Sequence, residues 1–238
     1  MRKMYLSAPL PFVGQKRMLA KEFMKVLEQY PDGTLFVDLF GGSGLLSHIT
    51  KSLKPHSTVI YNDFDNYRFR MKHIPQTNQL LADIREMVGN SVPRHKIIKG
   101  ELRERIFSRI EQEENSTGYV DFITLSSSIL FSMKYKLSVQ DMRKEALYNN
   151  IRKTGYPECT DYLEGLEIVS CDYKEVFNRY KDIPGVVFLV DPPYLSTDVG
   201  TYNMYWNMAD YLDVLNVLKG HSYVYFTSNK SGAVRMDR

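Results

Sequence analysis

The chain has 238 residues, with 31 Lys and Arg against 28 Asp and Glu, so its formal net charge at pH 7 is only +3. This mild charge permits a nucleic-acid partner without requiring one, and two cysteines are too few for a disulfide framework. The sequence has no cluster with metal-ligand spacing, no signal peptide and no apolar run that could span a bilayer, which predicts a soluble cytoplasmic protein with neither a metal nor a membrane partner.

The first elements alternate between helix and strand. Periodicity and turn signals predict a helix over 15–29, a strand over 35–39, a helix over 45–53 and a strand over 58–61. The loop after the first strand is Phe40-Gly41-Gly42-Ser43-Gly44. A strand-loop-helix-strand unit of this kind implies parallel strands joined by a right-handed crossover.

The pattern changes between residues 66 and 165. This stretch is mostly helical, and its clearest helices are expected over 77–88, 100–113 and 139–150. Because strand-helix alternation is missing here, we expect an insertion between the second and third strands. The predicted domains are therefore a core of residues 1–65 with 166–238, and a helical insertion of residues 66–165.

Alternation resumes after the insertion. The sequence predicts a strand over 166–170, a helix over 172–180, a strand over 186–190, a helix over 208–218 and a strand over 222–227. Together with the first unit, these elements predict an α/β fold with a mostly parallel sheet.

The glycine-rich loop predicts a ligand site. Gly42-x-Gly44 lets the backbone approach a ligand closely and directs helix N–H groups toward it. The loop lacks a Walker lysine and the third glycine of a dinucleotide fingerprint. Asp63 ends the next strand, where an acid can bind a pair of ribose hydroxyls, although an ordinary turn residue is the alternative. A nucleoside without a pyrophosphate, such as S-adenosylmethionine, fits these features better than NAD or ATP.

Two interpretations of Asp172 remain open. With Glu175 three residues later, it resembles a capping box at the start of a helix. It also follows the third strand, where Asp172 and Tyr173 would face the adenine of a bound cofactor. The two roles are compatible.

Asp191-Pro192-Pro193-Tyr194 follows the apolar strand over 186–190. It lies at the carboxyl end of this central strand, where open α/β sheets bind ligands and carry out chemistry. The prolines fix φ and restrict the residue before each of them. The Asp191 carboxylate and the Pro192 carbonyl can accept two amine hydrogens, and the Tyr194 ring can stack on a flat base. A simple turn after a strand is the alternative.

Taken together, these motifs resemble the DNA N6-adenine methyltransferases of the Dam-like, or α-class, group. The segments that carry the resemblance are 36–44, 62–63, 170–175 and 191–194, and residues 11–17 look like the first motif of that family. The resemblance implies a Rossmann-like sheet with a helical target-recognition insertion and S-adenosyl-L-methionine as the cofactor. It also implies methyl transfer to N6 of an adenine flipped out of double-stranded DNA, in a prokaryotic or phage-infected cell.

The family's functional residues can be placed by motif. The resemblance assigns catalysis to Asp191, Pro192, Pro193 and Tyr194. It assigns cofactor binding to Phe12, Gly14, Lys16, Asp38, Phe40, Gly42, Gly44, Asp63, Asp172 and Tyr173. Among the basic residues of the insertion, the expected DNA contacts are Lys134, Lys136, Arg152 and Lys153.

Three departures from the family pattern are visible. Phe12 stands where the family often has Trp, and Gln15 replaces a second glycine. The stretch 148–157 lacks the Asn-Val-Pro-Phe-Gly-like run of GATC-reading members, so GATC is not predicted as the target. The family's sheet normally continues past the strand over 222–227, so we expect an uncovered edge there, in a truncated enzyme or one covered by a second subunit or a dimer mate.

Other function classes remain as alternatives. An RNA adenine or protein glutamine N-methyltransferase would use similar chemistry, but such enzymes more often carry Asn at the position of Asp191 and lack a large helical insertion. A non-catalytic or partner-dependent DNA-binding remnant would fit a short C-terminus. A nucleotide-binding oxidoreductase is disfavoured because the dinucleotide fingerprint is incomplete.

Overall fold

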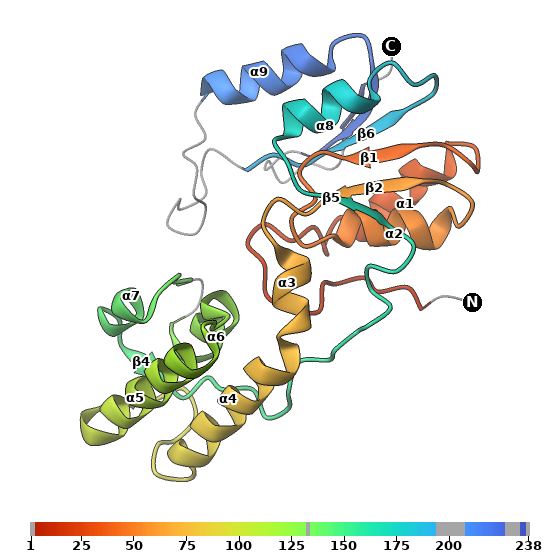
Figure 1. Ribbon diagram of the computed structural model, residues 1–238. Coiled ribbons are helices and arrows are strands. Elements are labelled where there is room, and N and C mark those ends of the chain that lie inside the picture. Colours follow the sequence, from red (N-terminus) through yellow and green to blue (C-terminus); the bar gives the residue numbers. More distant parts are fainter. Residues whose placement is uncertain (1–2, 132–133, 194–207, 227–233, 237–238) are drawn as a thin grey trace.

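The computed structural model describes residues 3–131, 134–193, 208–226 and 234–236. In these residues six strands form one sheet in the order β5-β2-β1-β6-β7-β8 (Figure 1). They are β1 (Phe36–Asp38), β2 (Val59–Asn62), β5 (Glu167–Val169), β6 (Val187–Val190), β7 (Ser222–Tyr225) and β8 (Val234–Met236). All neighbouring pairs are parallel except β7 and β8. This mostly parallel sheet with its helices confirms the expected Rossmann-like α/β fold.

Helices cover both faces of the sheet (Figure 1). They are α1 (Ala20–Glu28), α2 (Leu45–Leu53), α8 (Tyr173–Tyr180) and α9 (Met208–Leu218). Side chains alternate along each strand, so Phe36 and Val187 pack with α1 and α2, whereas Val37 and Phe188 pack with α8 and α9. Because both faces are buried, these strands read as continuous apolar runs in the sequence.

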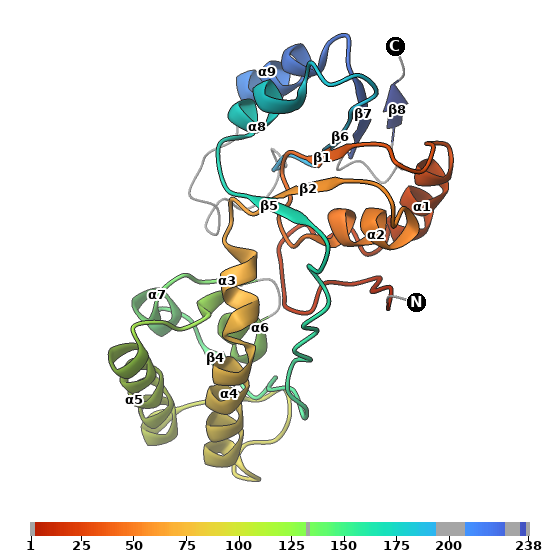
Figure 2. The same cartoon turned by 45° about the vertical axis from the view of Figure 1, so that its right-hand side comes forward.

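The insertion forms a second, helical body (Figure 2). Its elements are α3 (Tyr67–Lys72), α4 (Ile74–Val88), β3 (Ile97–Ile98), α5 (Gly100–Thr117), α6 (Phe122–Ile129), α7 (Val139–Arg143) and β4 (Leu147–Tyr148). It has a hydrophobic core of its own, in which Ile84, Phe107 and Leu125 are fully buried. Leu10, from the segment before α1, joins this core. The N-terminal segment therefore contacts the insertion as well as the sheet.

Helix boundaries inside the chain differ most from the sequence prediction at two places. The helix expected over 15–29 begins only at Ala20, because residues before it form turns that bring Lys16 to the end of the sheet. The helix expected over 139–150 ends at Arg143, since Leu147 and Tyr148 pair antiparallel with Ile97 and Ile98.

The helix α6 was missed in the sequence because it is rich in Ser and β-branched residues, which are weak helix formers. Burial against the rest of the insertion and one N-cap stabilise this helix in place of local helix propensity. The Asp121 side chain accepts a hydrogen bond from the Thr124 N–H, and most of the helix is buried in the core of the insertion.

The expectation of an uncovered edge beside β7 was wrong. Residues 234–236 form β8, which pairs antiparallel with β7 from Tyr223 to Tyr225. A three-residue strand carries too little hydrophobic pattern to be recognised in the sequence. The chain therefore covers this edge of β7 itself, and no partner subunit is needed for that purpose.

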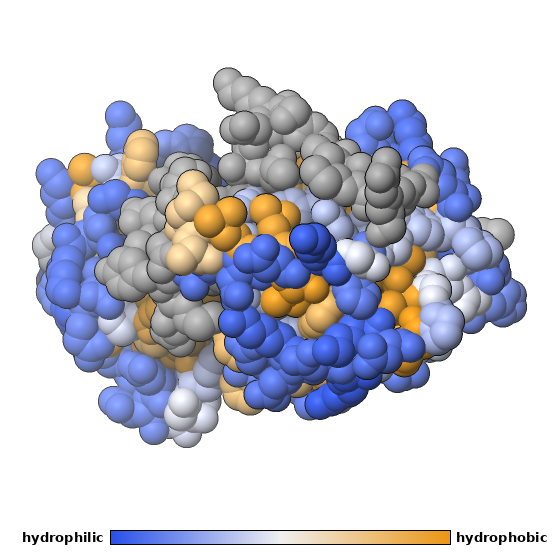
Figure 3. Space-filling model, turned by 90° about the horizontal axis from the view of Figure 1, so that it is seen from above, coloured by the Kyte–Doolittle hydropathy of each residue, from blue (hydrophilic) through white to orange (hydrophobic). Residues whose placement is uncertain are grey.

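Seen from above, apolar patches interrupt a largely hydrophilic surface (Figure 3). On α9, Met208, Leu212 and Leu215 are exposed at helical spacing, while Val214 and Leu218 face the core. Apolar residues therefore lie on both the exposed and the buried side of α9. Within the described ranges no helix is long and apolar enough to cross a membrane.

Candidate active site

The glycine loop packs its backbone directly against two aromatic rings. A Cβ atom on Gly41 would lie 2.3 Å from the Tyr61 ring, and one on Gly42 would lie 3.0 Å from the Phe12 ring. Gly42 and Gly44 have positive φ, and Gly44 is the N-cap of α2. Larger residues would fill the space between the loop and these rings, so the sequence needs glycine here.

A cavity of about 310 Å³ opens at the carboxyl ends of β1, β2 and β6, the position expected for ligands in open α/β sheets. It collects most of the residues that the sequence singled out. Those lining it are Phe12, Gly14, Lys16, Phe40, Gly42, Asp172, Tyr173, Asp191, Pro192 and Pro193. Tyr194 lies outside the described residues.

Lys16 and Asp191 form an ion pair in this cavity. Lys16 Nζ lies 2.6 Å from Asp191 Oδ2 and donates a hydrogen bond of 2.6 Å to the Gly14 carbonyl oxygen. Lys16 is 8% exposed and Asp191 is 17% exposed, so water screens the pair poorly. Burying two charges is costly even when they pair, and buried charges that lie together in a cavity are typical of functional sites. The first motif and the Asp-Pro-Pro-Tyr motif are therefore joined at one point.

Asp38 lies beneath the cavity and does not line it. It is fully buried, and its Oδ2 accepts a hydrogen bond of 2.7 Å from Ser47 Oγ. Burial, followed by the nearby Asp191 charge, raises the pKa of Asp38 to about 7, while the Ser47 bond opposes this shift. Asp38 thus joins the end of β1 to the first turn of α2 and does not line the cavity.

Asp63 is also turned away from the cavity. Its carboxylate accepts hydrogen bonds from the backbone N–H groups of Tyr67 at 2.6 Å and Arg68 at 3.1 Å, at the start of α3. Burial raises the pKa of Asp63. The neighbouring acid Asp65 does line the cavity, and desolvation, then the Asp63 charge, raises its pKa.

Aromatic rings form the wall near α8. The Phe40 and Tyr173 rings lie 4.9 Å apart, tilted by 30°. Asp172 caps α8 by accepting a 2.8 Å hydrogen bond from the Lys174 N–H, which confirms its predicted capping role. Since Asp172 also lines the cavity, the cap leaves it beside the place where a flat ligand would bind.

Asn62 was not chosen from the sequence as a site residue. Its Nδ2 donates to the carbonyl oxygens of Leu39 and Cys171 at 2.9 Å each, and its Oδ1 accepts from the Cys171 N–H. It lines the cavity and ties together the ends of β1, β2 and β5. An Asn at a strand end directly before an acid is the signal that could have identified it.

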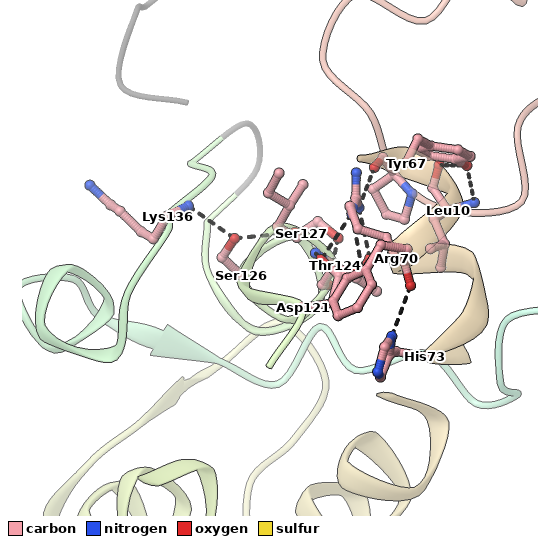
Figure 4. Close-up of polar contacts among 12 residues, drawn as sticks. Leu10, Tyr67, Arg70, His73, Asp121, Thr124, Ser126, Ser127 and Lys136 are labelled. Carbon is pink, nitrogen blue, oxygen red and sulfur yellow. Dashed lines mark hydrogen bonds and ion pairs between the residues drawn. The ribbon is translucent and has the colours of Figure 1, made fainter. Parts of the chain in front are cut away.

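Arg70 was also missed as a cavity residue, because an Arg inside a helical pattern carries no local signal. It lines the cavity from α3, together with Ile123 and Leu137 of the insertion. Figure 4 shows Arg70 beside Asp121 and Thr124 of α6. Side chains from the insertion therefore complete a cavity that begins at the sheet.

The four basic residues expected to contact DNA do not line this cavity. Lys134 and Lys136 both pair with Glu145, at 2.5 and 3.0 Å. Arg152 lies over the Tyr156 ring, 4.3 Å from its centroid, and Lys153 is exposed. None of these contacts prevents DNA binding, but Glu145 compensates part of the lysine charge.

Two comparisons with known proteins agree with this arrangement. A family model described as D12 class N6 adenine-specific DNA methyltransferase matches residues 12–219. The chain is also 38% identical over 240 residues to a protein of Haemophilus influenzae named "Putative methyltransferase", and the match covers 98% of this chain and 80% of that protein. The resemblance carried by the sequence motifs is thereby confirmed. The chain is a methyltransferase and belongs to the D12 class family of N6 adenine-specific DNA methyltransferases.

Proposed function

We propose that this protein transfers a methyl group from S-adenosyl-L-methionine to N6 of an adenine flipped out of double-stranded DNA. The observation that carries the proposal is that Asp191 and Pro192 open into the same cavity as the glycine loop. An acceptor pair for an exocyclic amine and a cradle for a nucleoside cofactor therefore share one space. The membership of the D12 class family supports the same reaction.

The residues present fit the cofactor. Phe40 and Tyr173 offer aromatic surface for its adenine, and Asp172 lies beside them. The backbone of Gly41 and Gly42 is open to close approach, because neither residue has a Cβ. The ribose role of Asp63 stays a proposal, and it requires the carboxylate to turn toward the cavity, which it does not line.

The acceptors supply the chemistry on the protein side. The adenine amine is a poor nucleophile because its lone pair is delocalised into the ring. Accepting its two hydrogens at Asp191 and at the Pro192 carbonyl directs the lone pair out of the ring plane, toward the electrophilic methyl group that the bound cofactor supplies. The Asp191 carboxylate then stabilises the positive charge that develops on nitrogen, and the proton leaves after methyl transfer.

Lys16 positions this carboxylate. Its ammonium holds Asp191 Oδ2 and is itself fixed by the Gly14 carbonyl, so the orientation of the carboxylate is set before the base arrives. A target amine has to share or displace this contact. Lys16 is a positioning residue in the proposed reaction, since it acts through Asp191.

Access to the base requires the DNA to open. A flipped adenine costs roughly a few kcal/mol of stacking and pairing, which contacts with the protein offset. We propose that Tyr194, outside the described residues, stacks on the flipped base, and that the helical insertion contacts the duplex. We also propose that residues 1–65 with 166–238 form the catalytic domain and residues 66–165 the target-recognition domain.

Methyl transfer itself tests the proposal. The protein is incubated with S-methyl-labelled cofactor and unmethylated genomic DNA, and the DNA is digested to nucleosides and resolved by mass spectrometry. We expect label in N6-methyldeoxyadenosine. RNA and protein substrates are tested in parallel, and label only in one of these would overturn DNA as the substrate. Bound cofactor without transfer to any substrate would favour a non-catalytic remnant.

A further inference from the structure

Arg70 connects three parts of the molecule. It lies in the last turn of α3 and is 6% exposed. Its Nε lies 3.2 Å from both carboxylate oxygens of Asp121, the N-cap of α6. Its Nη2 donates to the Pro11 carbonyl oxygen at 2.8 Å and to Thr124 Oγ1 at 3.1 Å (Figure 4). One guanidinium therefore joins the first motif to the insertion.

The second terminal nitrogen has no such partner. Arg70 Nη1 is buried and makes no hydrogen bond within the described residues. A guanidinium carries five N–H donors, and a buried donor without an acceptor is costly. Other atoms of Arg70 form part of the cavity wall, so a small rotation of the guanidinium would present Nη1 to an acceptor on a ligand in that cavity.

The chemistry of the wall indicates which ligand group this is. Guanidinium groups bind carboxylates strongly and often through two parallel hydrogen bonds. The only anionic group of S-adenosylmethionine is the carboxylate of its amino-acid end. The aromatic wall of Phe40 and Tyr173, at the start of α8, suits the other end of the cofactor. In Figure 1 the helix α8 lies above the strands of the sheet and α3 lies below them.

Asp65 strengthens this assignment. It lines the same cavity and is close enough to Arg70 for the guanidinium charge to oppose the rise in its pKa. A carboxylate and a guanidinium on one wall match the ammonium and the carboxylate of an α-amino acid. Adenine carries no charged group and would match neither side chain.

We propose that Arg70 binds the α-carboxylate of the cofactor through its second terminal nitrogen. This inference rests on the proposed function, because it takes S-adenosylmethionine as the ligand. It adds a binding residue that none of the sequence motifs contains. Because the same side chain holds Asp121 and Pro11, carboxylate binding also fixes the insertion against the first motif.

The test compares two ligands that differ only in this carboxylate. Binding of S-adenosylhomocysteine and of its decarboxylated analogue is measured by calorimetry, so no turnover is involved. For the wild-type protein we expect S-adenosylhomocysteine to bind about 10- to 100-fold more tightly. In Arg70→Gln the ratio of the two dissociation constants should fall to about threefold or less.

Two further variants separate binding from folding. Arg70→Gln leaves Asp121 buried without its partner, so the double variant Arg70→Gln/Asp121→Asn removes both charges and should show the same low ratio. Asp121→Asn alone keeps Arg70 and should keep the wild-type ratio. A structural role for Arg70 would weaken both ligands equally and leave the ratio unchanged.

The outcomes distinguish this inference from the proposed function. A wild-type protein that binds both ligands within threefold of each other overturns the role of Arg70 and leaves the cofactor assignment standing. An unchanged ratio in the double variant does the same. A wild-type protein that binds neither ligand overturns the cofactor assignment, and the role of Arg70 with it.

Discussion

The two parts of the molecule use charge in different ways. At the end of the sheet, Lys16, Asp38 and Asp191 are mostly or fully buried and lie close together. In the insertion, Arg70 and Asp121 form one buried pair beside the cavity, but farther from it charged side chains pair near the surface, as Arg143 does with Glu104 and Glu111. Exposed pairs contribute little stability each, whereas buried charges are costly and are retained where they serve a reaction.

This difference decides how a function can be inferred. Two of the buried charges at the sheet end, Lys16 and Asp191, meet in one cavity, and the geometry of their contact is specific. The basic residues of the insertion are numerous, and many of them pair with neighbouring acids. A count of basic residues therefore says little about where DNA binds, while one buried ion pair says much about where the chemistry occurs.

The largest effect should come from Asp191, at the centre of the buried cluster. We expect Asp191→Ala to lower turnover by about 10³-fold or more, because the amine loses its charged acceptor. Cofactor affinity should stay within about threefold of wild type, which is less than the loss expected when a charged hydrogen bond to the cofactor is removed. Turnover and cofactor dissociation constants are measured on the same preparation. Asp191→Asn keeps one acceptor oxygen and should lose less activity, and retained turnover within tenfold for Asp191→Ala would refute the assigned role.

Glycines give a second comparison of the two parts. In Gly41→Ala the new Cβ would lie 2.3 Å from the Tyr61 ring and 2.5 Å from the Asn62 carbonyl oxygen, so backbone has to move. We expect a loss of about 2–4 kcal/mol in the free energy of unfolding.

The matched control is Gly118→Ala in the insertion. Gly118 has a φ of +73° but no atom near its missing Cβ, so only the left-handed conformation is penalised, by roughly 1–2 kcal/mol. Urea unfolding of both variants gives the two values. Equal losses would mean that the glycine loop is not as tightly enclosed as its geometry indicates.

The buried acid Asp38 should give the sheet a pH-dependent stability of its own. Because burial raises its pKa to about 7, the folded protein keeps a proton there that the unfolded chain releases from its usual pKa of 3.8 upward. The wild-type free energy of unfolding should therefore fall between about pH 4 and pH 7. Relative to wild type, Asp38→Asn should gain roughly 2–3 kcal/mol between pH 5 and pH 8.

An acid of the insertion should behave in the opposite way. Arg143 and Arg103 lower the pKa of the exposed Glu104, so its contribution is present above its usual pKa of 4.5 and lost as the pH falls below it. The difference in the free energy of unfolding between Glu104→Gln and wild type should thus be present near neutral pH and disappear only under acidic conditions. Urea unfolding at several pH values measures both variants, and parallel curves for Asp38→Asn and wild type would contradict the buried proton.

The same contrast explains what the sequence could predict. The helix over 45–53 matches α2, and the loop before it and the cap at Asp172 were recognised correctly, because each depends on a few adjacent residues. The chemistry of a turn or a cap is local, and a sequence pattern contains it fully. The fold class followed from the alternation of such elements.

Features that depend on distant contacts were missed. The end of α7 is set by the pairing of Leu147 with Ile98, far away in the chain, and α6 is stable because the insertion buries it. The place of Arg70 in the cavity depends on Pro11 and Asp121, which no local pattern connects. Lys16 and Asp191 were each singled out from their own motifs, but their ion pair appears only once the fold brings the motifs together.

The smallest effect should come from the surface of the insertion. Glu145 pairs with Lys134 and Lys136, so Glu145→Gln releases two ammonium groups for phosphate contacts. We expect DNA affinity to rise about two- to tenfold, and the dependence of log K on log salt to steepen by about 1–2, as each released lysine reaches a phosphate. Fluorescence anisotropy with a short duplex at several salt concentrations measures both.

Glu22→Gln is the control, because it removes the same charge from an exposed pair with Lys25 on α1. Glu22→Gln should leave the salt slope unchanged. A general effect of net charge would instead raise the DNA affinity of both variants by the same factor. If Glu145→Gln changes neither affinity nor slope, Lys134 and Lys136 do not face the duplex. The DNA surface would then lie elsewhere on the insertion, with the exposed Arg152 and Lys153 after β4 as the next pair to substitute.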